Sequence, residues 1–500
     1  MSDAPGAQPA PLSLGSRAGL SVLCGVLAGV GHQPFSLVPI SLLGLAAVFI
    51  LWRGLLTWRG AFLVGWAAGV GYFGLTLHWI VEPFLVDVAR HGWMAPFAAV
   101  FMASGMALFW GAAAAFAWRL GPRSALAWAV TLALAEFSRA YVMTGFPWVL
   151  VGTIWVESVA RGWASVMGVH GLTLVTLLGL SGCVALGARV GGPLLVGSAA
   201  VLLGGGALLL PAVQSDLGDQ PMVRLVQPNA PQDQKWDPRF FREFIDRQIA
   251  FTGAPSRVPV DLVVWPEAAI PYRLNDAGPV FAQIADQAPQ ATTVLGVIRR
   301  DAGQVYNTMV AVREAGVVAQ YDKSHLVPFG EYVPLAPIAR RFGVRGLAAE
   351  DGFGYAAGPG PRLIDLAEIG TALPLICYEG IFPHGLNKVE GRADFLLLIT
   401  NDAWFGTFSG PFQHLTQAQM RAVEQGLPMV RVANTGVSAM IDPGGRITAS
   451  IPLGQAGFID ARLPMAASAT LYSRTGDIPF AVLTILLLLV AHLGQQRKTN

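Results

Sequence analysis

At residues 374–380 the chain reads Pro-Leu-Ile-Cys-Tyr-Glu-Gly, where an apolar strand runs into a turn. Cys377 stands at that junction and is the only cysteine outside the strongly hydrophobic segments, which contain Cys24 and Cys183. A lone cysteine in such a place is commonly a small buried hydrophobe. Two other segments of the chain favour a second interpretation, in which Cys377 is a nucleophile.

Those two segments are also apolar strands, and each ends in a charged side chain. Glu267 follows Val-Val-Trp-Pro at residues 263–266, and Lys323 follows Tyr-Asp at residues 321–322. Catalytic groups of α/β sheets gather at the carboxyl ends of strands, so we expect both side chains near Cys377. A carboxylate, an ammonium group and a thiol would act as base, oxyanion clamp and nucleophile, which predicts acyl transfer through a thioester. The alternative from the residues alone is a structural acid, a solvated lysine and an inert core thiol.

The composition of the whole chain indicates an integral membrane protein. Of its 500 residues, 53% are hydrophobic and only 13% are charged, whereas soluble domains carry about 25% charged residues. The mean hydropathy is +0.52. Residues 12–210 and 478–493 are almost continuously apolar, while residues 212–476 read as a globular domain. The net charge of +2, with basic residues at loop ends, gives no support to a nucleic-acid partner.

Eight apolar segments are candidates for membrane spans, which need roughly 20 apolar residues each. Several of them, the first two and the last included, reach this length only with flanking residues. Seven segments precede the globular domain and one follows it. This predicts a membrane domain at residues 1–211, a soluble domain at 212–476, and a final span with its tail at 477–500. The expected spans cover residues 18–31, 36–51, 61–80, 94–117, 124–140, 166–186, 193–210 and 478–493.

The distribution of basic residues predicts the orientation of these spans. Loops rich in Lys and Arg stay on the cytoplasmic side, and acids balance bases in the loops of the opposite side. Both termini should therefore be cytoplasmic, with the soluble domain facing outward. The first sixteen residues lack Lys and Arg, and no cleavage pattern follows, so we expect the first segment to remain as an anchor. The basic residues of the cytoplasmic side are Arg17, Arg53, Arg59, Arg119, Arg123, Arg189, Arg497 and Lys498.

The soluble domain alternates strand and helix, and its Val/Ile/Leu-rich strands predict sheets covered by helices. No glycine-rich phosphate-binding motif and no cluster with metal-ligand spacing occurs in the sequence. We therefore expect a layered α/β domain without a nucleotide site or a metal. The expected strands cover residues 222–227, 261–265, 292–298, 307–313, 317–321, 373–377, 395–400, 428–433 and 437–442, and the expected helices 238–251, 278–285 and 413–425.

Two longer segments carry a family resemblance. Residues 323–334 read Lys-Ser-His-Leu-Val-Pro-Phe-Gly-Glu-Tyr-Val-Pro, and residues 400–406 read Thr-Asn-Asp-Ala-Trp-Phe-Gly. Together with the acid, the lysine and the thiol, the sequence resembles the nitrilase superfamily, whose members share a Glu-Lys-Cys triad on an α-β-β-α sandwich. With eight expected spans it looks, over essentially the whole chain, like the bacterial apolipoprotein N-acyltransferase family.

The resemblance implies a reaction and a location. Cys377 would carry an acyl chain taken from a phospholipid, and pass it to the α-amine of the diacylglyceryl-modified cysteine of an apolipoprotein. Glu267 would be the acid and base, and Lys323 with the Tyr378 backbone N–H would hold the oxyanion. No cofactor is implied; the partners are the phospholipid, the apolipoprotein and membrane lipids. The family resemblance places the protein in the bacterial inner membrane with its catalytic domain in the periplasm.

Several further residues match positions of the family without a fixed role. Glu331 and Glu379 could take part directly or could be ion-pair partners that position Lys323. Trp236 matches a tryptophan near the substrate entrance, and from its neighbours alone it would be a surface aromatic. We expect His325 and His414 to make structural hydrogen bonds, because the triad leaves them no necessary role.

Residues 335–360 form a Gly-, Ala- and Arg-rich stretch that interrupts the strand pattern. Loops of this length inside a compact domain are commonly functional or disordered. We interpret the stretch as a lid whose apolar side chains, Phe342, Val344 and Leu347 among them, face acyl chains. The alternative is a simple surface insertion.

Two other functions compete with N-acylation. A membrane-tethered nitrilase-type amidase would resolve the thioester with water and would need no lipid-linked amine. An inactive lipid- or lipoprotein-binding protein would not need an intact Glu267, Lys323 and Cys377, and all three are present. The large apolar region fits a lipid-borne donor and acceptor better than either alternative.

Overall fold

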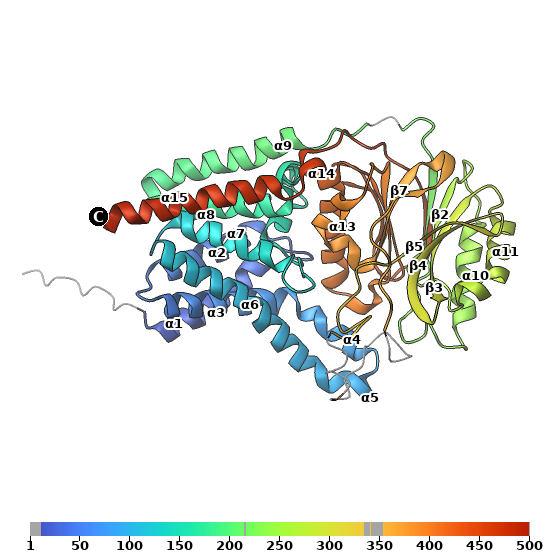
Figure 1. Cartoon of the computed structure of the whole chain (residues 1–500), viewed down its shortest axis with the longest axis horizontal. Coiled ribbons are helices and arrows are strands. Elements are labelled where there is room, and N and C mark those ends of the chain that lie inside the picture. The colour runs from blue at the N-terminus through green and yellow to red at the C-terminus, as the bar shows by residue number, and fades with distance from the viewer. Residues whose placement is uncertain (1–11, 215–216, 335–340, 342–353, 500) are drawn as a thin grey trace, which may run out of the picture.

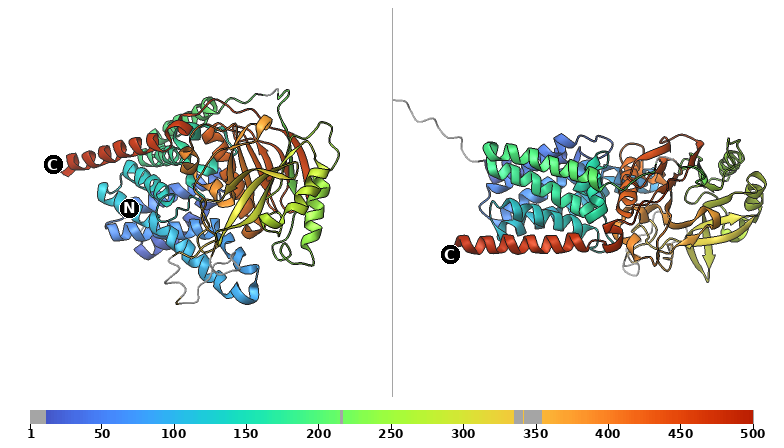
Figure 2. Two further views of the ribbon diagram at one scale, coloured as in Figure 1. Left: turned by 45° about the vertical axis from the view of Figure 1, so that its right-hand side comes forward. Right: turned by 90° about the horizontal axis from the view of Figure 1, so that it is seen from above.

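The computed structural model describes residues 12–214, 217–334, 341 and 354–499. A bundle of helices lies beside a layered β-structure, and the C-terminal helix runs back along the bundle (Figure 1). The same end-to-end arrangement of the two parts is seen from above (Figure 2). The lid expected at residues 335–360 lies mostly outside the described residues, as do Phe342, Val344 and Leu347.

Small residues let the helices of the bundle approach closely, as in other membrane helix pairs. Where α1 (Leu14–Gly29) meets α3 (Trp58–Thr76), a Cβ on Gly25 would lie 1.9 Å from the Ala68 carbonyl oxygen. The helix α8 (Ala164–Ala200) is broken by non-helical backbone at Gly168 and Gly187. The other helices of this part are α2 (Val38–Arg53), α4 (Glu82–Leu85), α5 (Val88–His91), α6 (Ala95–Leu120), α7 (Ala125–Arg139), α9 (Gly206–Leu209) and α15 (Ile478–Thr499).

Helices occupy all eight segments that were expected to cross a membrane, but not all reach spanning length. Among the described residues, four helices are long and apolar enough, and a fifth counts if α3 is joined to the following turns across a 65° bend. α1 and α2 have 16 residues and α7 has 15. At 1.5 Å per residue each extends about 24 Å or less, short of a core of about 30 Å. The four are Val88–Leu120, Val159–Gly187, Gly191–Leu209 and Ile478–Arg497.

The α/β part contains two six-stranded sheets. The first has the order β12-β1-β2-β3-β4-β5, and the second β11-β10-β9-β8-β7-β6. β1, β2 and β3 are parallel, as are β7, β8 and β9, and the flanking strands are antiparallel. The strands are β1 (Met222–Gln227), β2 (Leu262–Val264), β3 (Thr292–Asp301), β4 (Gln304–Arg313), β5 (Gly316–Asp322), β6 (Ile364–Asp365), β7 (Thr371–Ile376), β8 (Phe395–Thr400), β9 (Met429–Ala433), β10 (Ser438–Ile441), β11 (Ile447–Ile451) and β12 (Gly457–Arg462).

The two sheets pack face to face through buried aliphatic side chains, and helices cover their outer faces. α10 (Phe241–Thr252) and α11 (Gly278–Gln287) lie on the first sheet, and α13 (Gly410–Gln425) lies on the second. The expected layered α/β domain is thus confirmed, and all nine expected strands are present with small shifts at their ends. α13 also lies between the second sheet and the helical bundle (Figure 1). Cys377 is part of the buried cluster between the two sheets, and α13 contacts its main chain through His414.

Three strands were not predicted from the sequence. β6 has only two residues, and every residue of β12 is only half-buried. β11 alternates half-buried and exposed residues before its buried end. Strands at or near a sheet edge lack the continuous apolar run that marked the central strands, because one of their faces meets solvent.

Candidate functional site

Three strand ends supply the residues singled out in the sequence. Cys377 directly follows β7, Lys323 directly follows β5, and Glu267 lies three residues beyond β2. All three side chains are buried, with 6%, 1% and 6% of their surface exposed, respectively. The Lys323 Nζ lies 3.5 Å from Glu267 Oε1. The two sheets, packed face to face, thus bring β2 and β5 of one sheet to β7 of the other.

Glu267 and Glu331 share the ammonium group of Lys323. The closer contact is with Glu331, whose Oε1 lies 2.9 Å from Nζ. Asn307 donates to Glu267 Oε1 at 2.7 Å and to Glu331 Oε1 at 3.3 Å, and so fixes the spacing of the two carboxylates. Burial alone would lower the pKa of Lys323, but the charges of Glu331 and Glu267 outweigh it and raise the pKa above its ordinary value. Lys323 is therefore a permanent cation in this site.

The backbone of Cys377 is held in an unusual conformation. Its φ of 50° lies in the left-handed region, which residues other than glycine rarely adopt. A 3-10 turn over Cys377–Ile381 begins at this residue. Such sparsely populated geometry persists where the surroundings impose it, and it is concentrated at functional sites.

The thiol of Cys377 is held in its neutral form. Burial raises its pKa well above the usual range and the charge of Glu267 raises it further, while the charge of Lys323 and a hydrogen bond with the Thr400 side chain act in the opposite direction. A neutral thiol needs a base to become a nucleophile, and Glu267 is a carboxylate close enough to influence the thiol. Glu267, whose charge acts on the thiol, is thus the candidate for that base.

Glu379 does not contact the side chain of Lys323, and it ties the loops of the site together. Its Oε1 accepts from the Tyr321 hydroxyl at 2.8 Å and from the Ser324 N–H at 2.8 Å. Its Oε2 accepts from the Ile376 N–H at 2.9 Å. Of the two roles left open by the sequence, Glu331 has the ion pair with Lys323, and Glu379 bridges the ends of β5 and β7.

A cavity of about 590 Å³ opens beside these residues. Trp236 stands in its wall with 39% of its surface exposed, a position that suits an entrance. Carboxylates and amides form the inner end, and aromatic side chains form much of the rest. Its lining includes Trp236, Glu267, Asn307, Glu331, Asn401 and Trp404.

The loop between α7 and α8 contacts the turn over Cys377–Ile381 and the segment after β5. The Tyr378 hydroxyl donates to the Gly145 carbonyl oxygen at 3.0 Å, and His325 Nε2 lies 3.0 Å from the Thr144 carbonyl oxygen. The His325 ring also stacks on Phe382 with centroids 3.9 Å apart. His325 thus makes the structural contacts expected of it. Tyr378, which follows Cys377 in the chain, connects this turn to the helical part of the protein.

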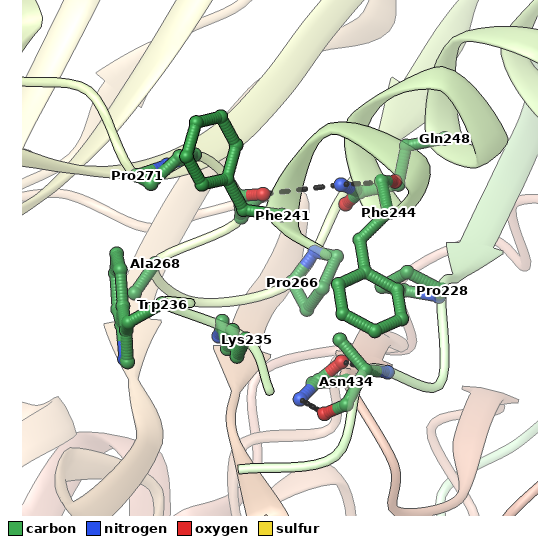
Figure 3. Close-up of a pocket in the computed structure, with 12 residues that line it drawn as sticks. Pro228, Lys235, Trp236, Phe241, Phe244, Gln248, Pro266, Ala268, Pro271 and Asn434 are labelled. Carbon is green, nitrogen blue, oxygen red and sulfur yellow. Dashed lines mark hydrogen bonds between the residues drawn. The ribbon is translucent and has the colours of Figure 1, made fainter. Parts of the chain in front are cut away.

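Lys235 is a second buried lysine in the site, which we did not single out in the sequence. Its Nζ donates to the main-chain oxygen of Glu267 at 3.0 Å. Burial lowers its pKa to about 8, against the opposing charges of Glu267 and Cys377. It lies among Trp236, Pro266 and Ala268 around a small cavity of about 10 Å³ (Figure 3). In the sequence, only its place beside Trp236 pointed to the site. A lysine in a loop ordinarily lies in solvent, so its burial was not expected.

Comparison with known proteins gives matches over both parts of the chain. Residues 223–471 match the family of carbon-nitrogen hydrolases, and residues 24–181 match the apolipoprotein N-acyltransferase N-terminal domain. The apolipoprotein N-acyltransferase of Caulobacter vibrioides is 40% identical, covering 93% of this chain and 92% of that protein. Its namesake in Rhodopseudomonas palustris is 35% identical, covering 96% and 95%, and that in Brucella melitensis is 37% identical, covering 86% and 85%.

Proposed function

This chain belongs to the apolipoprotein N-acyltransferase family, and from that premise we propose that it acylates lipoproteins through a thioester on Cys377. Family membership makes it an acyltransferase of lipoprotein maturation within the carbon-nitrogen hydrolase superfamily. The observation that carries the mechanism is the buried Cys377, in a left-handed backbone conformation, under the charges of Glu267 and Lys323. The acyl donor is a phospholipid and the acceptor a diacylglyceryl-modified apolipoprotein.

In the first half-reaction, Glu267 takes the proton of the Cys377 thiol as the sulfur attacks the ester carbonyl of the phospholipid. The Nζ of Lys323 and the N–H of Tyr378 hold the negative oxygen of the tetrahedral intermediate. The carbon–oxygen bond then breaks, and the departing lysophospholipid oxygen receives the proton from Glu267. The acyl chain remains on the sulfur.

In the second half-reaction, the α-amine of the lipoprotein attacks the thioester carbonyl. Glu267 takes a proton from the amine, the same two donors hold the oxyanion, and the carbon–sulfur bond breaks. The proton returns to sulfur and the amide is complete. Because amines attack thioesters more readily than oxygen esters, the covalent intermediate divides a difficult transfer into two easier steps.

The eight helical segments support a membrane arrangement with residues 1–211 as the first membrane domain, 212–476 as the catalytic domain and 477–500 as the last span. Helices of 15 or 16 residues would cross only with flanking residues or a locally thinned bilayer. The bias of Arg and Lys toward one side supports an inner-membrane protein with cytoplasmic termini and a periplasmic catalytic domain.

The orientation is tested by two exposed threonines on opposite sides of the proposed membrane. In a Cys377→Ala background and intact spheroplasts, a membrane-impermeant maleimide should label Thr144→Cys and leave Thr57→Cys unlabelled. Both positions are exposed, so access and not burial decides the labelling. Labelling of Thr57→Cys alone would invert the topology.

The mechanism is tested by mass spectrometry of the Cys377 peptide after the purified full-length protein meets phospholipid without lipoprotein. We expect a hydroxylamine-sensitive acyl adduct that is absent in Cys377→Ala and is discharged by a diacylated lipopeptide. Unmodified Cys377 with intact phospholipid would overturn the donor assignment. Discharge by water as fast as by lipopeptide would favour the amidase.

A further inference from the structure

His414 contacts the main chain of the nucleophile candidate and belongs to a second buried charged cluster. It is the fifth residue of α13 and is almost fully buried. Its Nε2 lies 3.3 Å from the Cys377 carbonyl oxygen, and its Nδ1 lies 2.9 Å from Asp402 Oδ1. The Cys377 carbonyl can only accept, so the ring donates to it from Nε2, while Nδ1 lies between the Asp402 carboxylate and Arg431 Nη2. The imidazole thus bridges Cys377 to Asp402.

Asp402 is itself fixed from several directions. Arg431 Nη2 donates to its Oδ2 at 2.6 Å, and the same nitrogen lies 3.2 Å from His414 Nδ1. The Thr400 hydroxyl donates to Oδ1 at 2.9 Å. Burial would raise the pKa of Asp402, but the charges of Arg431 and His414 outweigh it and hold the pKa well below its usual range. The carboxylate is therefore a rigid acceptor for the histidine.

The helical bundle holds the same part of α13. Trp148 stacks on the His414 ring with centroids 5.6 Å apart, at an angle of 24°. The neighbouring Gln413 accepts, at its Oε1, from Trp148 Nε1 at 2.8 Å and from Trp79 Nε1 at 3.2 Å. Trp79 and Trp148 both belong to the amino-terminal half of the chain. This part of the protein therefore directly contacts His414 and its neighbour Gln413.

We propose that His414 is a positioning residue, which holds the Cys377 carbonyl and thereby keeps the nucleophile in its left-handed conformation. Trp79 and Trp148 fix His414 through Gln413 and through ring stacking, so that the helical bundle helps to shape the catalytic turn. The inference rests on the proposed role of Cys377 as the acyl carrier.

Two substitutions separate the two hydrogen bonds of the ring. In His414→Gln the side-chain amide reaches the place of Nε2 and can still donate to Cys377. In His414→Asn the shorter amide replaces Nδ1 and keeps only the bond to Asp402. We expect His414→Asn to form the Cys377 adduct roughly tenfold to a hundredfold more slowly, the size of one lost buried hydrogen bond. His414→Gln should recover most of the rate.

The measurements use the full-length protein in detergent, with adduct formation followed at several phospholipid concentrations. The maximal rate should fall in His414→Asn while the half-saturating concentration stays constant, and thermal unfolding should show that both variants are folded. Equal rates in the two variants, or a faster His414→Asn, would overturn the inference. Failure of the wild type to form any adduct would instead count against the proposed function.

A lipid-free readout keeps the inference testable in that case. Iodoacetamide alkylation of Cys377, measured on its own peptide, should be faster in His414→Asn because release of the carbonyl loosens a turn that buries the thiol. It should be near the wild-type rate in His414→Gln. A Gln413→Leu variant, which loses both tryptophan bonds, should shift both rates in the same directions by smaller factors; unchanged rates there would remove the helical bundle from the proposal.

Discussion

Two buried charged clusters flank Cys377, and they differ in whether they border a cavity. The first, Glu267, Lys323 and Glu331, lines the cavity of about 590 Å³ through its two carboxylates. The second, Asp402, His414 and Arg431, is sealed, with at most 1% of any side chain exposed. We call these the front cluster and the rear cluster. Both hold charge in the interior, yet only the front cluster meets a space that substrate can enter.

The distribution of charge within each cluster explains the difference. In the rear cluster one carboxylate meets two donor side chains, so its negative charge is compensated. In the front cluster two carboxylates share one lysine, and the shorter contact, 2.9 Å against 3.5 Å, goes to Glu331. Glu267 is therefore the acid less tightly paired with Lys323, and its charge acts on the Cys377 thiol. The comparison assigns proton exchange to the front cluster and rigidity to the rear cluster.

The largest expected effect contrasts the two acids. Glu267→Gln removes the proton acceptor and should slow formation of the Cys377 adduct by roughly 10² to 10⁴-fold, with a nearly unchanged unfolding temperature. Asp402→Asn breaks a buried ion pair and should cost about 3 to 5 kcal/mol of stability. Adduct kinetics and thermal unfolding of both variants give the measurement. Loss of stability in Glu267→Gln with normal kinetics would reverse the assignment.

The second prediction compares the two lysines of the site. Lys323→Met removes an oxyanion donor and should slow adduct formation by roughly 10² to 10³-fold. Lys235→Met is the matched control, since it deletes a buried ammonium group that donates to the Glu267 main chain and lies over the Trp236 ring, and its effect on the rate should be much smaller. Comparable losses in the two variants would mean that Lys235 shares the oxyanion role.

The sequence indicated the front cluster, but of the rear cluster it indicated only the hydrogen-bonding role of His414, which the structure confirms, and the reason is physical. Glu267, Lys323 and Cys377 each end an apolar strand, and strand ends of an α/β sandwich converge, so their proximity could be predicted. Arg431 lies inside the apolar strand β9, and nothing in its neighbours indicates the side chain it pairs with. Its partnership depends on the packing of the strand against other elements, which is a property of tertiary structure.

The helical part shows the same limit. Apolar runs located a helix in each of the eight expected spans but not α4 or α5, and they do not decide whether a helix of 15 or 16 residues reaches across a bilayer. α1 is an example, because its 16 residues are bounded by the Ser13 cap and the turn after Gly29. Lys235 was missed because its burial depends on the side chains around it, and a loop between β1 and α10 gives no periodic signal.

The smallest expected effect is the pH dependence of stability due to Lys235. It tests whether this buried lysine beside the front cluster loses its proton in the folded protein. The folded-state pKa of about 8 lies below the ordinary 10.5. Below pH 8 the folded protein therefore bears the full cost of a buried charge, and between pH 8 and 10.5 the unfolded state binds more protons. The wild type should accordingly gain stability relative to Lys235→Met as the pH rises through this window, by at most about 3 kcal/mol. Thermal unfolding of both proteins at pH 7 and pH 10 measures the change. A constant difference would show that Lys235 keeps its proton throughout this window.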